Sequence, residues 1–235
     1  MCGRFTLTAD FSALEDVFPG LAAPDPPVLR PRYNVAPTQP VAVVQNDDRK
    51  QIEMARWGLV PSWARDVSVG ARMINARAET LGEKSAFRDA IVHRRCLVLA
   101  TGFYEWQTRP GQRRKTPMYL RLRSGRPFAF AGLWDTWRRR AGEPLLSCTI
   151  ITTSPNELVA PIHDRMPVIL RPADVERWLE SRPGTGDWRT VFAPYAADEM
   201  EAYPVSTRVN DVDIDDAALL DHSEPPPEPQ YDLFD

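Results

Sequence analysis

The second residue carries the most distinctive chemistry of the chain, which begins Met1-Cys2-Gly3-Arg4-Phe5. Removal of Met1 is tolerated before a small residue, and it would leave Cys2 with both a thiol and a free α-amine. A thiolate is a strong nucleophile, and an α-amine with a pKa of about 7.7–8.0 is largely unprotonated just above neutral pH. Such a 1,2-aminothiol condenses with an aldehyde to an imine, which the thiol closes to a five-membered thiazolidine. The alternative is that Cys2 is a small buried apolar residue.

Four further polar residues lie in or beside apolar, strand-like runs: Asn75, Glu105, Thr152 and His163. A carboxyl group between aromatic residues at a strand end has its pKa raised by desolvation, which suits Glu105 to donate a proton. A histidine that titrates near neutral pH can shuttle the same proton, and His163 is the candidate. Considered singly, a residue such as Glu105 or His163 is more often a hydrogen-bonded structural group than a catalytic one.

Composition indicates one sizeable globular domain, because 43% of the 235 residues are hydrophobic. The three cysteines (Cys2, Cys96 and Cys148) form no disulfide framework, which favours a reducing compartment. The histidines are far apart, so we expect no metal site and no cofactor. Neither a signal peptide nor a membrane-spanning run is evident, and we expect a cytoplasmic protein that is nucleoid-associated when bound to DNA.

Charge is distributed unevenly along the chain, although the net charge is only −3. Residues 1–170 carry 24 Lys and Arg against 16 Asp and Glu, whereas residues 171–235 carry 5 against 16. Nearly all of the basic residues are arginine, which binds phosphate through two hydrogen bonds and stacks on bases. The first part of the chain therefore predicts a basic, nucleic-acid-binding face, unless the arginine content reflects genome composition alone.

Strand patterns predominate over helix patterns, and no regular alternation of strand and helix appears. The strand-like runs are 41–44, 51–57, 96–103, 118–123, 128–134 and 146–152, and the helix-like runs are 12–18, 85–94, 155–160 and 172–180. We therefore expect an α+β fold: a single domain, residues 1–222, built on a curved, mostly antiparallel, barrel-like β-sheet with peripheral helices. Residues 223–235 are acidic and rich in proline, which predicts a disordered tail.

Six short motifs occur in a fixed order: CGRF from Cys2, RYNVAP from Arg32, RWGLVPSW from Arg56, INARAET from Ile74, GFYEW from Gly102 and HDRMP from His163. Together they closely resemble the SRAP family (SOS response associated peptidase), the abasic-site processing proteins. The resemblance covers nearly all of residues 2–210. It implies a DNA-damage response protein that crosslinks covalently to abasic sites in single-stranded DNA and shields the lesion.

The resemblance also implies roles for individual residues. Glu105 would protonate the sugar ring oxygen and help open the abasic deoxyribose to its aldehyde. The Cys2 amine would attack C1′ and the thiol would close the thiazolidine, while Asn75 would orient the amine. His163 would manage protons around the imine and assist reversal. Because an imine can also β-eliminate, weak lyase activity is compatible with the same site.

The implied DNA contacts involve side chains in five of the motifs and Thr152. Phosphates would be held by Arg4, Arg77 and Thr152, and phosphate contacts position a strand without reading its sequence. Trp106, with Trp63, would pack against bases or split the strand from a duplex. Asn34, in the second motif, belongs to the same implied DNA-binding set.

Two other functions fit the same residues. An N-terminal cysteine with Asn, Glu and His nearby also describes a thiol peptidase that cuts after Met1, so self-cleavage could be the maturation step. A non-catalytic single-stranded DNA binder, in which Cys2 is incidental, is the third interpretation. Replacing Cys2 with alanine distinguishes the simple binder from the other two, because only the activity of the binder would be unchanged.

The last residues carry a second hypothesis about partners. The run from Gln230 to Phe234, QYDLF, resembles the pentapeptide by which bacterial proteins bind the replicative sliding clamp. Leu233 and Phe234 would fill an apolar pocket, and Gln230 would form a hydrogen bond beside it. The alternative is an acidic tail that only keeps the protein soluble.

Overall fold

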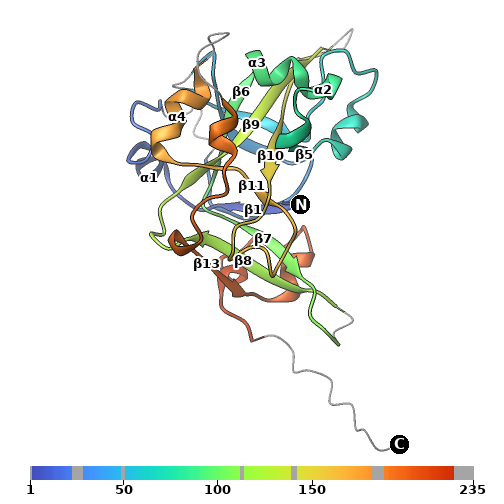
Figure 1. Ribbon diagram of the computed structural model, residues 1–235. Coiled ribbons are helices and arrows are strands. Elements are labelled where there is room, and N and C mark those ends of the chain that lie inside the picture. The colour runs from blue at the N-terminus through green and yellow to red at the C-terminus, as the bar shows by residue number, and fades with distance from the viewer. Residues whose placement is uncertain are drawn as a thin grey trace, which may run out of the picture.

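A computed structural model describes residues 2–22, 29–48, 51–111, 114–138, 142–180 and 188–224. Its two β-sheets meet close to the N-terminus (Figure 1). The strands are β1 (Arg4–Leu7), β2 (Arg32–Val35), β3 (Pro40–Gln45), β4 (Ile52–Trp57), β5 (Asn75–Arg77), β6 (Arg95–Ala100), β7 (Gly102–Gln107), β8 (Thr116–Leu122), β9 (Phe128–Trp137), β10 (Leu145–Thr153), β11 (Met166–Pro167), β12 (Ile169–Leu170) and β13 (Met200–Pro204).

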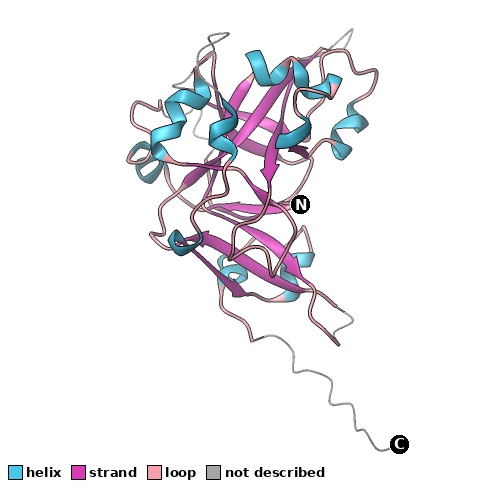
Figure 2. Ribbon diagram, in the orientation of Figure 1, coloured by secondary structure: helices cyan, strands magenta, loops and turns pink. Residues whose placement is uncertain are grey.

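The larger sheet closes into a five-stranded barrel. Its strands follow the order β10-β4-β3-β6-β9, and β9 pairs back onto β10. Only β4 and β5 run parallel to β10; the other pairs of named strands are antiparallel. Short helices surround this barrel (Figure 2). The expected α+β fold, with a curved, mostly antiparallel, barrel-like sheet and peripheral helices, is thus confirmed.

The second sheet is fully antiparallel, with the order β13-β8-β7-β1-β2. It lies below the barrel in Figure 1. The sequence pattern predicted one strand over 96–103, but the chain leaves the barrel at Thr101 and continues as β7 in the second sheet. Gly102 permits this crossing because a Cβ there would lie 2.2 Å from the hydroxyl oxygen of Tyr119.

The helices are short. They comprise α1 (Phe11–Glu15), α2 (Ser85–Arg88), α3 (Ala90–His93) and α4 (Pro172–Leu179), with 3₁₀ segments η1 (Val67–Arg72), η2 (Ala78–Thr80), η3 (Trp188–Phe192), η4 (Ala197–Glu199), η5 (Thr207–Asn210) and η6 (Ala217–Leu220). The pattern over 172–180 predicted α4 almost to the residue, with Pro172 in the first turn. The predicted helix over 85–94 is instead divided into α2 and α3. Of the predicted helix over 12–18, only the part up to Glu15 is helical, within α1. None of the helices within the described ranges has the length and apolar character needed to cross a membrane.

The helix predicted over 155–160 is wrong, because these residues form hydrogen-bonded turns. The side chain of Asn156 accepts a hydrogen bond from the backbone N–H of Val159 at 2.9 Å and donates one to the carbonyl of Tyr195 at 2.7 Å. Pro161 follows directly and disfavours helical backbone at the residue before it. His163 directly follows these turns, and its backbone N–H donates a hydrogen bond to the carbonyl of Val159 at 2.9 Å.

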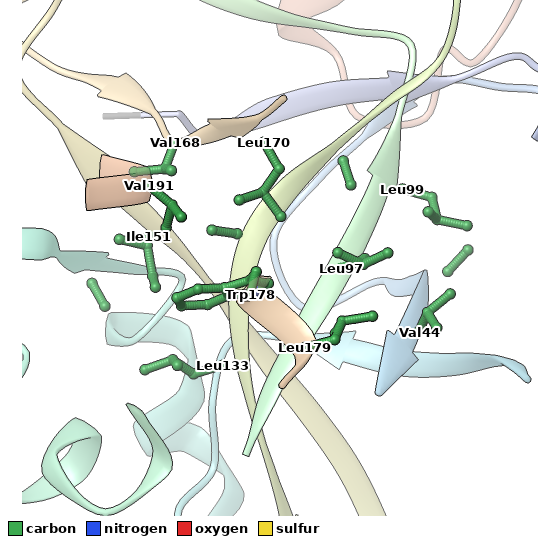
Figure 3. Packing of buried hydrophobic residues seen from close by; sticks show 14 of the residues in the cluster. Val44, Leu97, Leu99, Leu133, Ile151, Val168, Leu170, Trp178, Leu179 and Val191 are labelled. Carbon is green, nitrogen blue, oxygen red and sulfur yellow. The ribbon is translucent and has the colours of Figure 1, made fainter. Parts of the chain in front are cut away.

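Two apolar clusters lie on opposite faces of the barrel strands. The outer cluster packs under the helices around Trp178 of α4, whose indole N–H donates to the carbonyl of Cys96 at 2.9 Å (Figure 3). The other cluster joins the barrel to the second sheet through Phe5, whose ring packs edge-on against Trp57 and Phe130. Cys2 belongs to this second cluster, so the N-terminal residues lie at the junction of the two sheets.

Candidate active site

Cys2 lies two residues before the first residue of β1 and is fully buried. Its Sγ lies 3.9 Å from the carbonyl oxygen of Arg4. Burial raises the pKa of the Cys2 thiol well above its ordinary range, and the negative charge of Glu105 adds to this effect. The thiol is therefore neutral at physiological pH, and it needs a base to react as a thiolate.

Asn75 connects β5 to Cys2. Its side-chain Nδ2 donates a hydrogen bond to the carbonyl oxygen of Cys2 at 2.7 Å. Its Oδ1 is buried and has no hydrogen-bond partner in the described part of the chain. Asn75 lies opposite Ile150 of β10, and the indole of Trp57 donates to the carbonyl of Ile74 at 2.9 Å. An unused acceptor is thus held rigidly beside the N-terminal residue.

A contact between two glycines supports the loop that leads to β5. The Cβ of any residue replacing Gly58 would lie 2.5 Å from the carbonyl oxygen of Gly70, and the reverse substitution would meet the Gly58 carbonyl at 2.5 Å. Gly58 also has a φ of +124°, a backbone conformation that only glycine adopts readily. The short segment between this contact and Asn75 leaves β5 little freedom to move.

Glu105 reaches the same place from β7. Arg4 lies opposite Tyr104 in the antiparallel β1–β7 pair, so Glu105 lies beside the residues that precede Arg4. Glu105 is only 2% exposed, and burial raises its pKa from 4.5 to about 7. A group with this pKa is present both as acid and as base near neutral pH, which suits proton transfer.

His163 faces Glu105 from the loop that follows the turns. Its Nε2 lies 3.9 Å from Oε2 of Glu105. Its Nδ1 accepts a hydrogen bond from the backbone N–H of Arg165 at 3.0 Å and lies 2.8 Å from Oδ1 of Asp164. The backbone N–H of Arg165 favours the tautomer that carries its proton on Nε2, toward Glu105, whereas the Asp164 carboxylate favours the ring protonated on both nitrogens. Burial lowers the pKa of His163, which favours the neutral ring.

Arg4, Asn34 and Trp106 form a connected group on the second sheet. Arg4 is 9% exposed, and its Nη1 donates to Oδ1 of Asn34 and to the carbonyl of Val209, both at 2.7 Å. The Arg4 guanidinium lies 5.9 Å from the ring centroid of Trp106, whose N–H donates to Oδ1 of Asn210 at 2.8 Å. Asn34 is fully buried and has no surface available to DNA in this structure, contrary to the expectation from the resemblance.

The remaining expected DNA contacts are dispersed. Arg77 is exposed at the end of β5, and Thr152 lies opposite it on β10. Thr152 is fully buried, and its Oγ1 has no partner in the described residues. Trp63 is 62% exposed, but its loop is tied through Ser62 to β9, near the opposite end of β10. The structure therefore does not bring Trp63 together with Cys2.

One pair of residues beside the site was missed by sequence reasoning. Arg165 donates from Nη1 and Nη2 to the two carboxylate oxygens of Glu79, at 2.7 and 2.9 Å, and from Nη2 to the carbonyl of Thr152 at 2.7 Å. Both residues belong to the motifs quoted above, but no spacing in the sequence pairs them. Gln230, Leu233 and Phe234, the expected clamp-binding residues, lie outside the described residues.

The structure thus has a barrel joined to a second sheet, a buried cysteine at position 2 near the Glu105 carboxyl group, and a histidine that faces that carboxyl group. The model of the SOS response associated peptidase (SRAP) family matches residues 1–212, and the chain belongs to this family.

Named relatives and solved structures agree with this assignment. The chain is 46% identical over 223 residues to the abasic site processing protein YoaM of Bacillus subtilis, covering 94% of this chain and 98% of that protein. It is also 46% identical to the abasic site processing protein YoqW of the same organism, covering 89% and 94% respectively. A crystal structure of a protein from Bacteroides thetaiotaomicron superimposes with a TM-score of 0.84 at 25% identity, covering 95% of this chain and all of that one.

Proposed function

We propose that this protein processes abasic sites in single-stranded DNA by attaching covalently to them through Cys2. Its relatives are named for abasic-site processing, and its N-terminal residues carry the chemistry that an aldehyde requires. The observation that carries the proposal is the placement of Cys2, held by Asn75 through its carbonyl and close enough to Glu105 for that charge to affect its thiol.

The reaction begins with removal of Met1, which frees the Cys2 amine. Glu105 in its acid form donates a proton to the ring oxygen of the abasic deoxyribose, the bond from C1′ to that oxygen breaks, and the C1′ hydroxyl group releases its proton to water to give the aldehyde. The amine adds to C1′ and forms a carbinolamine, which loses one water to give the imine. The thiol then adds to C1′, and its proton passes to the former imine nitrogen, directly or through Glu105. One aldehyde and one aminothiol thus become one thiazolidine and one water.

Two neighbours serve this sequence without forming bonds to the sugar. The unused Oδ1 of Asn75 accepts an N–H of the Cys2 amine and directs its lone pair toward C1′. His163, with its proton on Nε2, exchanges that proton with Glu105 and so returns it to the acid form. This pairing supplies an acid for ring opening and a base for the thiol within one buried site.

DNA is held mainly through its phosphates, which fits a target that lacks a base. Arg77 is exposed and binds phosphate directly, whereas Arg4 and Thr152 are buried and support from beneath the surface that the strand crosses. Asn34 contributes to DNA binding indirectly, because its side chain holds the Arg4 guanidinium by a hydrogen bond. Trp106 lies beside Arg4 and offers a stacking surface for a flanking base, and Trp63 offers a second, more distant one.

The peptidase in the family name fits the same residues as a maturation step. The Cys2 thiol can attack the carbonyl carbon of Met1, so that the methionyl group passes from the Cys2 nitrogen to sulfur, with Glu105 or His163 moving the proton. Water then hydrolyses the thioester, which releases methionine and restores the thiol before crosslinking. Intact mass of the Glu105→Gln variant checks this step, because retention of Met1 is expected only if cleavage depends on the site. β-Elimination from the imine would give the protein a weak lyase activity.

The test is a denaturing gel of mature protein incubated with single-stranded DNA that contains one abasic site. Wild-type protein is expected to give a heat-stable band of reduced mobility, and Cys2→Ala none. Cys2→Ser should give at most a labile adduct, because a hydroxyl closes the ring poorly. Cys96→Ala and Cys148→Ala are matched controls. Both wild-type thiols are buried within barrel strands, so each variant should crosslink normally. A normal adduct from Cys2→Ala contradicts the proposal.

A further inference from the structure

The Arg165–Glu79 ion pair joins the two segments that carry the reactive neighbours of Cys2. Glu79 lies in η2, directly after the β5 strand that contains Asn75. Arg165 lies two residues after His163, and its backbone N–H holds Nδ1 of that histidine. Through its side chain Arg165 also holds the carbonyl of Thr152 on β10. One guanidinium thus joins the His163 loop to β10 and to η2, which directly follows β5.

The geometry of this pair is more constrained than that of an ordinary surface ion pair. Both carboxylate oxygens of Glu79 accept from separate nitrogens of Arg165, at 2.7 and 2.9 Å, which fixes the plane of the guanidinium as well as its position. The Arg165 side chain is 15% exposed, whereas that of Glu79 is 53% exposed. The guanidinium is therefore held in place largely by a partner that is itself open to solvent.

We propose that Glu79 is a positioning residue: through Arg165 it holds His163 facing Glu105, with Nε2 3.9 Å from Oε2, and it contributes little to the stability of the fold. At this separation a proton passes through one water or after a small approach of the two groups. This inference rests on the proposed function, because it assigns a residue that acts on the rate of crosslinking. Small displacements of reacting groups have large kinetic costs, since misplacement by about 1 Å can lower a rate about 100-fold.

The charge of Glu79 gives the proposal a distinctive signature. Glu79 places a negative charge beside Arg165 and near Arg77, on the side of the site that would face phosphates. Its removal should leave affinity for single-stranded DNA unchanged or make it tighter, because repulsion of phosphates is relieved. A slower reaction together with equal or tighter binding cannot be explained by lost DNA contacts.

The experiment compares Glu79→Ala with Glu201→Ala, which removes the carboxylate of a different ion pair. Glu201 accepts from Arg121 at 2.7 Å between β13 and β8, away from Cys2, and its side chain is 29% exposed. Affinity is measured with DNA that carries a tetrahydrofuran analogue, which has no aldehyde. The crosslinking rate is measured at saturating abasic DNA from pH 5 to 8, and the melting temperature by calorimetry.

Glu79→Ala should lower the saturated crosslinking rate at least about 10-fold and alter its pH profile. Its melting temperature should fall by no more than about 2–4 °C, because an exposed ion pair contributes little stability. Glu201→Ala should crosslink at the wild-type rate. In an Arg165→Met background, Glu79→Ala should have no further effect on the rate, because Glu79 acts through Arg165.

Two results would overturn the inference while leaving the proposed function intact. One is a wild-type crosslinking rate in Glu79→Ala. The other is a loss of rate accompanied by an equal loss of affinity or by extensive unfolding. Failure of the wild-type protein to crosslink at all would instead contradict the proposed function itself, so the two failures are distinguished by the wild-type reaction.

Discussion

Replacement of Glu105 with glutamine should make the protein more stable and less active, and the gain in stability should depend on pH. Glu105 is 2% exposed, and burial raises its pKa from 4.5 to about 7. The folded protein therefore binds this proton more tightly than the unfolded chain does. The contribution of the protonated Glu105 to the free energy of unfolding is fully present below pH 4.5, and it is lost as the pH rises through about 7.

The magnitude follows from the same two values. Holding the carboxylate in its buried site at pH 8 costs about 3 kcal/mol relative to the unfolded chain. Glutamine does not ionise and avoids this cost. The difference in unfolding free energy between Glu105→Gln and wild type should thus increase from near zero at pH 4.5 to about 3 kcal/mol at pH 8. Crosslinking by Glu105→Gln protein from which Met1 has been removed should slow about 100-fold, since glutamine donates no proton to the sugar.

Urea denaturation at several pH values measures the first effect, and a timed denaturing gel measures the second. Glu157→Gln is the matched control, because Glu157 is exposed and its replacement should leave the pH dependence unchanged. A difference between Glu105→Gln and wild type that stays constant between pH 4.5 and 8 would refute the reasoning, because burial would then not be opposing ionisation of Glu105.

Three further predictions concern DNA and partner binding. Arg77→Ala should weaken binding of single-stranded DNA of any sequence and reduce the slope of log affinity against log salt by about 0.7, measured by fluorescence anisotropy. Asn34→Ala should destabilise the fold by about 1–3 kcal/mol in urea, because backbone carbonyls lose their buried donor, and should also weaken DNA binding by releasing Arg4. A peptide of residues 224–235 should bind the bacterial sliding clamp, and the same peptide with Leu233 and Phe234 changed to alanine should not; equal affinities, measured calorimetrically, would remove that hypothesis.

The sequence predicted the fold where the signal was local. Apolar runs located most barrel strands, and Pro172 placed the start of α4. Short strands such as β1 and β5 were not predicted, because three or four residues of mixed polarity have no periodicity to detect. The division between β6 and β7 was not predicted either, since it depends on the contact of Gly102 with Tyr119, which is distant in sequence.

The sequence predicted which residues carry the chemistry of the site, but it predicted only part of their arrangement in space. Burial between aromatic residues suggested a raised pKa for Glu105, and the structure has that shift and that cause. The resemblance named Asn34 as a DNA contact, but only the three-dimensional structure shows that it is buried against Arg4. The pairing of Arg165 with Glu79 depends on two segments brought together by β10, which no pattern along the chain specifies.

The most direct test of the central claim is the mass and attachment point of the DNA adduct. Mature protein is reacted with abasic single-stranded DNA, and the adduct is digested with nuclease and protease and analysed by mass spectrometry. We expect the remnant on the N-terminal peptide at Cys2, with a mass below the sum of the reactants by one water. Borohydride should not reduce it, because the thiazolidine ring is closed. Attachment at any other residue, or a species that borohydride reduces as an open imine, would contradict the central claim.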